Sequence, residues 1–71
     1  MKVKVKEDLK VDTFYEGVMF VKGMEKYKGK IFNVEFVRIL GHEEIHLINS
    51  EGIDGGYIFS FPMLEIIEED E

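Results

Sequence analysis

The sequence predicts an all-β fold, namely a small, five-stranded, partly open barrel with a short 3₁₀ or helical turn. Short segments rich in β-branched and aromatic residues recur along the chain, and turn signals separate them at close intervals. Almost no segment follows a helical period. A chain of 71 residues has no room for two full sheets, so we expect one strongly bent sheet that partly closes on itself.

Length and composition predict a single domain over residues 1–67, followed by an acidic, solvated tail at 68–71. A chain this short buries only about 60% of its unfolded surface, so its core is small. Cysteine is absent, which excludes disulfides and thiolate zinc sites. Side-chain packing must therefore stabilise the fold, and six Phe and three Tyr residues supply bulky groups for it.

The net charge of −6 is unevenly distributed. Residues 1–30 carry a net +3 and residues 31–71 a net −9, and the last four residues are all acidic. This balance argues against a nucleic-acid partner, because phosphate binding needs a basic surface. The N-terminus lacks the apolar region of a signal peptide, and no apolar run approaches the roughly 18 residues of a membrane span. We expect a soluble, cytoplasmic protein that contacts no membrane.

The first half of the chain begins with a strictly alternating segment, Lys2 to Lys6, which predicts a half-buried strand with its valines on one face. The segment from Val11 to Val21 is ambiguous. Gly17 in its middle disfavours a helix, so we expect a partly irregular loop with a short strand near Val18 to Phe20. Phe14 is among the residues in this loop that we expect to be buried.

The strongest local signal is the stretch from Met24 to Val37, a Lys-rich turn that leads into a strand. Met24 to Lys28 can form a single helical turn that Gly29 ends. Lys30 to Leu40 is the longest predicted strand, and Val34 is expected in the core. Apolar residues occupy both alternating sets of this strand, so either both faces are partly covered or a bulge changes the register.

The second half of the chain continues as short strands and turns. The expected elements are a turn at 41–43, a strand at 44–50 with Ile45 and Leu47 inward and His46 outward, a turn at 50–56, a strand at 57–61, a 3₁₀ turn at Met63-Leu64 and a last strand at 65–67. The Asp54-Gly55 pair is a strong hairpin signal, because such turns require positive φ. Pro62 ends its strand since proline cannot donate to a ladder.

Four segments, in this order and spacing, resemble a family of very small Src-homology-3-like barrels from phage, prophage and low-GC bacterial genomes. The matching positions are Val5, Leu9, Tyr15, Gly17, Val18, Phe20, Met24, Tyr27, Gly29, Lys30, Phe59, Met63, Leu64 and Glu65. The closing strand of such proteins often carries tryptophan, whereas this chain has Tyr57 and Phe59. The resemblance implies a Src-homology-3-like fold and a phage-related origin, and it implies no activity.

The segment His42 to His46 reads HEEIH and matches H-E-x-x-H, with Glu65 at the spacing of some zinc peptidases. That chemistry needs a helix, where side chains four apart lie about 6 Å from each other. On a strand the two histidines are roughly 13 Å apart, from four steps of about 3.3 Å. The local residues favour a turn and a strand, so we expect no metal site and two solvated histidines at a hairpin.

Basic residues surround one tyrosine in the turn that precedes the longest strand. These candidate nucleic-acid contacts are Lys22, Lys26, Tyr27, Lys28 and Lys30. Lysines beside an aromatic ring can bind single-stranded nucleic acid by charge and stacking. The alternative is a solvated turn. The lysines of the first strand can in turn face Glu65, Glu68 and Glu69, if the first and last strands pair.

A set of aromatic residues forms the third constellation, and its candidate partner-binding members are Tyr15, Phe20, Tyr57 and Phe59, with Phe61 close by in the sequence. Barrels of this type bind extended peptides in aromatic-lined grooves. The competing interpretation places most of these rings in the core. Tyr15 and Tyr57 are then the residues expected to present a face to solvent.

Taken together, the sequence favours a non-catalytic binding or adaptor module that contacts a protein, a peptide or a second copy of itself. Nucleic-acid binding through the turn from Lys22 to Lys30 is the alternative. The sequence has no Ser/His/Asp or Cys/His arrangement with supporting context, so we expect no enzymatic activity and no cofactor.

Overall fold

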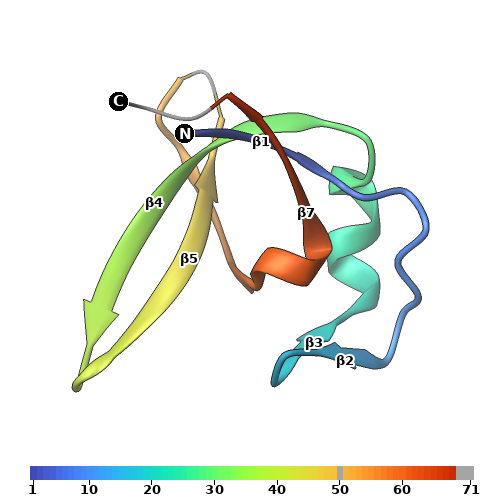
Figure 1. Ribbon diagram of the computed structural model, residues 1–71, viewed down its shortest axis with the longest axis horizontal. Helices are drawn as coiled ribbons and strands as arrows, with labels where there is room; N and C mark the ends of the chain where they lie inside the picture. Colours follow the sequence, from blue (N-terminus) through green and yellow to red (C-terminus); the bar gives the residue numbers. More distant parts are fainter. Residues whose placement is uncertain (50, 69–71) are drawn as a thin grey trace.

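The computed structural model describes residues 1–49 and 51–68, and this part of the chain is mostly β (Figure 1). Its elements are β1 (Lys2–Val5), β2 (Thr13–Tyr15), β3 (Val18–Phe20), the 3₁₀ helix η1 (Lys22–Tyr27), β4 (Ile31–Ile39), β5 (His42–Ile48), β6 (Asp54–Phe59), the 3₁₀ helix η2 (Phe61–Met63) and β7 (Leu64–Glu68). Residues 69–71 of the predicted acidic tail lie outside the described residues, and Glu68 ends β7.

Five of the strands form one antiparallel sheet in the order β6-β5-β4-β1-β7, and β2 and β3 form a separate hairpin. The two outer strands, β6 and β7, do not pair with each other within the described residues. The sheet is therefore open and is not a closed barrel. The predicted all-β class and the five-stranded antiparallel sheet are confirmed.

Strand β1 lies in the sheet between β4 and β7 and connects its two sides. Val3 and Val5 are fully buried, as the alternation predicts. The lysines point to the other face, where Lys2 is opposite Glu68 and Lys4 is opposite Glu65 on β7. The first and last strands thus pair, and this pairing was required for the predicted approach of these lysines to the glutamates.

The core is formed by residues from most of the elements and not by one face of the sheet alone. Its buried hydrophobic residues are Val3, Val5, Leu9, Phe20, Met24, Leu47, Phe59, Met63 and Leu64. Val34, predicted to be in the core, is partly buried and packs against this cluster. Every polar side-chain atom that is buried in the described residues has a hydrogen-bond partner.

Helix η1 brings Met24 into the core and begins two residues before the turn that the sequence predicts. The Val21 N–H donates to Met24 Sδ at 3.3 Å, which fixes the entry into the helix. Gly29 follows the helix with φ +75°, and its N–H donates to the Val5 carbonyl at 2.8 Å. A residue with a Cβ is strained at this φ, so glycine suits the point where the chain joins β1.

Strands β4 and β5 form the longest hairpin, and their register runs unbroken from Asn33–Ile48 to Ile39–His42. The bulge considered for β4 is therefore wrong. Phe32 packs against the core from one face, while Ile31 and Ile39 on the other face are exposed. In Figure 1 the closed end of this hairpin extends away from the rest of the molecule.

The β2–β3 hairpin corrects the prediction of an irregular loop between Val11 and Val21. Strand β3 lies where the sequence predicts it, but β2 was not expected. Tyr15 pairs with Val18, and these two side chains face the core cluster. Phe14 lies on the opposite face beside Met19 and is 64% exposed, so its predicted burial is wrong. Strand pleating explains the error, since neighbouring residues point to opposite faces.

The Asp54-Gly55 pair does not form the predicted turn, because both residues belong to β6. The turn before β6 is organised by Asn49, whose side-chain oxygen accepts hydrogen bonds from the N–H groups of Glu51 and Ile53 at 2.9 and 3.0 Å. The register between β5 and β6 shifts within the paired strands, and Gly56 of β6 has φ +82°. Asp54 accepts the Gly56 N–H at 2.7 Å, so its turn chemistry stabilises an irregularity inside a strand.

Two hairpins close through two-residue turns with positive φ at both positions. These are Glu16-Gly17, with φ +51° and +81°, and Leu40-Gly41, with φ +48° and +86°. Asn-Gly is the preferred pair at such turns, because asparagine and glycine tolerate the left-handed conformation. Glu16 and Leu40 are neither, so each turn carries local strain.

We predict that Glu16→Asn and Leu40→Asn each raise the free energy of unfolding by about 1 kcal/mol, since other residues lose roughly 1–2 kcal/mol in the left-handed region. For a domain of this size, that change raises the melting temperature by about 4–8 °C. Urea titrations and thermal melts measure both quantities. A decrease in stability for either variant would contradict the assigned turn conformation.

Candidate functional site

A pocket of about 180 Å³ opens between η1 and the β5–β6 hairpin. Its side-chain walls are Tyr27, Phe32, Leu47, Ile53, Tyr57 and Phe59, and Asn49 and Gly55 complete the lining. Phe59 and Leu47 are core residues and form the inner part, whereas Ile53 is 59% exposed. The pocket is thus an apolar, largely aromatic opening that reaches from the surface to the core.

The Tyr27 ring organises the aromatic wall. Its centroid lies 5.4, 5.9 and 6.1 Å from those of Phe32, Tyr57 and Phe59, and all three contacts are edge-to-face. Aromatic pairs favour this arrangement and gain about 0.5–1.5 kcal/mol beyond their buried area. The pocket wall is therefore held in place before any ligand arrives.

Two tyrosines and two glycines fix η1 against β6 in a reciprocal manner. The Tyr27 hydroxyl, from η1, lies 2.5 Å from the position that a Cβ would take at Gly55 of β6. The Tyr57 hydroxyl, from β6, lies still closer to the position that a Cβ would take at Gly23 of η1. Neither glycine can be replaced without displacing a tyrosine, so these contacts set the width of the pocket.

The volume of the pocket limits what it can bind. Pockets for small molecules and cofactors typically measure about 300–1,000 Å³. A pocket of about 180 Å³ is well below that range, and it suits a single apolar side chain. This size favours a protein or peptide ligand over a cofactor.

The four predicted partner-binding residues do not form one surface. Phe20 is fully buried and Phe59 is 3% exposed, so both belong to the core and Phe20 cannot meet a partner. Tyr57 and Phe59 line the pocket. Tyr15 is partly buried elsewhere, where its hydroxyl accepts the Lys10 N–H at 3.0 Å and its carbonyl accepts the Ser60 hydroxyl at 2.6 Å.

Sequence reasoning named Tyr27, Tyr57 and Phe59 as candidates and missed the other five lining residues. It assigned Phe32, Leu47 and Asn49 only to strands, and Ile53 and Gly55 only to a turn. An isolated isoleucine within a Gly-rich turn was the available signal. It also missed the contact of Phe61 with Phe36, two exposed rings whose centroids are 6.2 Å apart. These rings belong to β4 and η2 and lie outside the pocket lining.

The candidate nucleic-acid residues on and after η1 are largely engaged with the protein itself. Lys26 Nζ lies 5.3 Å from the centroid of the Tyr27 ring, and Lys28 Nζ lies 5.4 Å from that of Phe20 and 3.9 Å from a Glu25 carboxylate oxygen. Lys22 and Lys30 are exposed. The Tyr27 ring packs edge-to-face against three other rings of the pocket wall.

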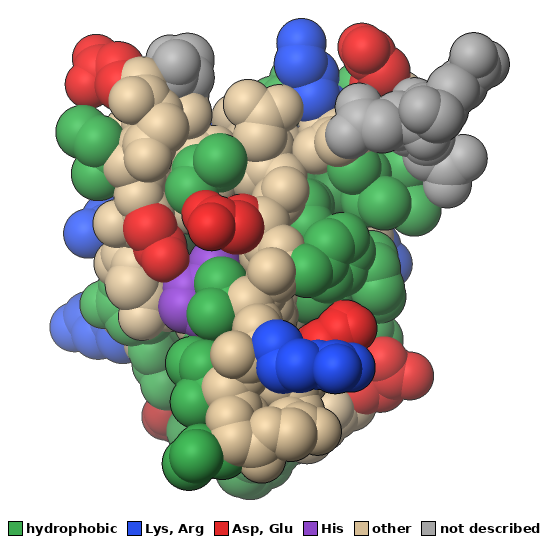
Figure 2. Space-filling model, turned by 90° about the vertical axis from the view of Figure 1, so that its left-hand side faces the viewer, with side chains coloured by type: hydrophobic (Ala, Val, Ile, Leu, Met, Phe, Trp, Pro, Cys, Tyr) green, Lys and Arg blue, Asp and Glu red, His purple; other side chains and the backbone are tan. Residues whose placement is uncertain are grey.

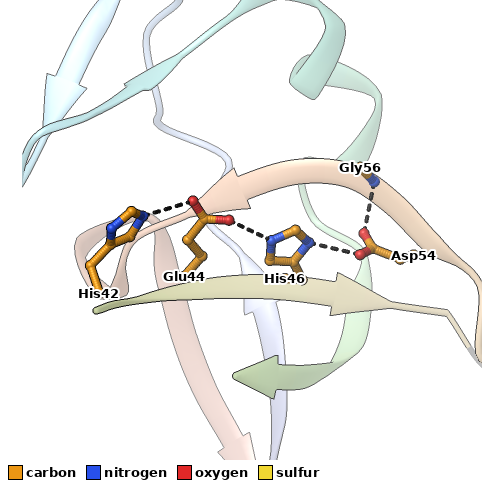
Figure 3. Close-up of polar contacts among 5 residues, drawn as sticks. All are labelled: His42, Glu44, His46, Asp54 and Gly56. Atoms are coloured by element: carbon orange, nitrogen blue, oxygen red, sulfur yellow. Dashed lines mark hydrogen bonds and ion pairs between the residues drawn. The ribbon is translucent and has the colours of Figure 1, made fainter. Parts of the chain in front are cut away.

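The opposite face of the β5–β6 hairpin carries a chain of polar side chains (Figure 3). His42 Nε2 and His46 Nε2 each lie 3.1 Å from a different oxygen of Glu44, and His46 Nδ1 lies 2.7 Å from Asp54 Oδ2. The other Asp54 oxygen accepts the Gly56 N–H. In Figure 2 histidine and acidic side chains lie side by side on this face.

His46 differs from the predicted solvated histidine, because its side chain is only 14% exposed. Both of its ring nitrogens face carboxylate oxygens. A neutral imidazole carries one N–H and can donate to only one of them, whereas the protonated ring donates to both. Glu35 of β4, directly opposite His46 across the sheet, adds a third carboxylate on this face. His42, by contrast, is 61% exposed, as predicted for a hairpin histidine.

The pKa values of the three central groups shift in the directions that this geometry requires. The hydrogen bond to Glu44 raises the pKa of His46, and burial of the ring opposes this rise. The hydrogen bonds from His46 and His42 lower the pKa of Glu44. The Gly56 N–H is the main cause that lowers the pKa of Asp54, and His46 adds to it.

The HEEIH segment lies on β5, which confirms the predicted strand and rejects a helix. His42 and His46 share a face of the strand with Glu44 between them, and each histidine contacts that carboxylate separately. Within residues 1–49 and 51–68, no group of three or more histidine or acidic side chains is arranged to hold one metal ion. In the same residues, no helix has the length and apolar character needed to cross a membrane.

Comparisons of this chain with protein-family models, with curated proteins and with solved structures found no match. The site must therefore be interpreted from its own geometry.

We predict that the contribution of His46 to stability depends on pH. Because its folded-state pKa is raised, the protonated ring stabilises the fold fully below its ordinary pKa of 6.5, and this is lost as pH rises through the raised pKa. The lowered pKa values of Glu44 and Asp54 act in the opposite sense. Their ionised carboxylates stabilise the fold fully above the ordinary pKa values of 4.5 and 3.8, and this contribution is lost as pH falls through the lowered pKa values. The polar chain therefore stabilises most between pH 4.5 and 6.5.

Urea titrations of the wild type and of His46→Gln, from this pH window up to alkaline pH, measure the contribution. The difference in unfolding free energy between the two proteins should be largest near the middle of that window and should shrink at alkaline pH. The exposed His42→Gln serves as the matched control and should show the smaller pH-dependent difference. A His46→Gln difference that stays constant with pH would contradict the raised pKa of His46.

Proposed function

We propose that this chain is a non-catalytic binding module whose aromatic pocket takes one apolar side chain from a protein or peptide partner. The observation that carries this proposal is the pocket itself, which is aromatic, preformed and about 180 Å³ in volume. Binding sites that take peptides commonly combine apolar pockets for individual side chains with a surrounding polar rim. Lys26 beside Tyr27, together with Asn49, supplies such polar groups.

The Src-homology-3-like character of the fold is part of the same proposal. Its support is the sheet of five antiparallel strands and the 3₁₀ helix η2 immediately before the last strand. A phage-related origin rests on the sequence resemblance alone. The cytoplasmic location expected from the sequence also stays part of the proposal.

We do not extend the proposal to nucleic acids. The Tyr27 ring, on which stacking would depend, packs edge-to-face against three other rings. The lysines around it remain candidates for contacts with acidic groups of a protein partner.

The test uses N-acetyl-leucine amide and N-acetyl-phenylalanine amide as probes for the pocket, titrated while NMR spectra are recorded. The resonances of Tyr27 and Tyr57 should shift. Ile53→Glu should weaken binding of either probe by at least about tenfold, because it places a carboxylate at an apolar opening. Ile53 is 59% exposed, so this variant should keep its fold.

Ile67→Glu, at an isoleucine of β7 that is 48% exposed and lies outside the pocket lining, is the matched control and should bind both probes as the wild type does. Titrations in which neither tyrosine responds would reject the pocket as a binding site, and so would an unchanged affinity in Ile53→Glu.

A further inference from the structure

Leu40 combines an exposed apolar side chain with a strained backbone conformation. Its side chain is 97% exposed, and its backbone has φ +48° at the first position of the β4–β5 turn. A solvent-exposed leucine alone needs no explanation. A leucine that also occupies a left-handed turn position, where asparagine would relieve the strain, is unusual. Local rules are broken most often at sites that serve a function.

The residues around Leu40 also indicate a function for its side chain. The other positive-φ hairpin residue, Glu16, is polar and exposed, as a turn residue normally is. At the β4–β5 tip (residues 39–42), the neighbouring Ile39 is also 40% exposed. The tip thus presents an apolar side chain at the end of a hairpin that extends from the body of the molecule (Figure 1).

The chain itself contains a receptor of suitable size. The aromatic pocket holds about 180 Å³ and is lined by apolar side chains. Leu40 cannot reach the pocket of its own chain, because β5 runs from the tip to Leu47 in the pocket wall, roughly 20 Å at about 3.3 Å per residue. Figure 1 likewise places the tip and η1 on opposite sides of the molecule. Only a second copy can bring the two together.

The charges of the two surfaces are complementary. The β4–β5 hairpin carries Glu35, Glu43 and Glu44 against Arg38. Helix η1 and the residue after it carry Lys22, Lys26 and Lys28 against Glu25. Lys26 lies over Tyr27, which is part of the pocket wall. The lysines of η1 thus supply a basic side of the pocket, and the acidic hairpin would approach that side.

We propose that Leu40 of one copy inserts into the aromatic pocket of a second copy of this chain. The proposal rests on the proposed function of the pocket and names its partner. Such a contact joins two different surfaces, so each pair keeps one free tip and one free pocket. Association then continues head to tail into chains, unless the rotation between copies closes a ring.

Sedimentation velocity of the wild type over a range of protein concentrations and at low and high NaCl provides the first measurement. The mass should increase with protein concentration and decrease at high salt, because salt screens the attraction between the acidic hairpin and the lysines of η1. Leu40→Asn and Ile53→Glu should each remain monomeric under conditions in which the wild type associates.

Glu16→Asn is the matched control for Leu40→Asn, since it makes the same replacement in the other positive-φ turn. It should associate as the wild type does. Both asparagine variants should melt about 4–8 °C higher than the wild type, as expected for relief of turn strain. Loss of association in a more stable protein cannot be attributed to unfolding.

The decisive measurement mixes Leu40→Asn with Ile53→Glu. The first variant keeps its pocket and the second keeps its tip, so the mixture should form a 1:1 dimer and nothing larger. A monomeric mixture would overturn the proposal, as would Leu40→Asn that associates like the wild type. If Ile53→Glu does not fold, Ile53→Ser takes its place.

The N-acetyl-leucine amide titration separates the two proposals. Leu40→Asn has an intact pocket that no second copy occupies, and it should bind this probe at least as tightly as the wild type does. A monomeric mixture together with probe binding would reject self-association and leave the proposed function of the pocket standing. Absence of probe binding in Leu40→Asn would reject both.

Discussion

The burial of Val3 and Val5 between β4 and β7 is the interaction on which the rest of the structure depends. Strand β1 is the only described strand that pairs with both β4 and β7, so it joins the C-terminal strand to the long hairpin. Gly29 also donates to the Val5 carbonyl, which attaches the end of η1 to the same strand. Without disulfides, this short alternating segment holds three parts of the chain around one core.

The position of η1 then determines the pocket. Met24 anchors the helix in the core, and the reciprocal contacts of Tyr27 with Gly55 and of Tyr57 with Gly23 set its distance from β6. The polar chain on the opposite face of the hairpin acts on the same strands, since His46 and Asp54 connect β5 to β6 where their register shifts. The width of the pocket thus depends on apolar contacts on one face and on hydrogen bonds on the other.

The sequence predicted the elements whose signals are local. Alternation identified β1, and the run after Gly29 identified β4, because each pattern is a direct consequence of strand pleating. The turn predicted at Asp54-Gly55 was wrong, because the side chain of Asn49 organises the turn instead. The preference of the Asp-Gly pair for turns does not take this side chain into account. The pocket and the raised pKa of His46 could not be predicted, since both require residues brought together by the register of β5 and β6.

The chain has more aromatic residues than its core can bury, which explains why a chain this small has a pocket at all. Of the nine aromatic side chains, only Phe20 and Phe59 are buried. A short chain encloses too little volume to house the other seven, so they lie at the margin of the core or on the surface. Rigid rings at a margin pack edge-to-face and leave gaps that a smaller aliphatic side chain would fill. A protruding leucine is such a side chain, and the strain retained at Leu40 is consistent with selection for contact rather than for stability of the isolated domain.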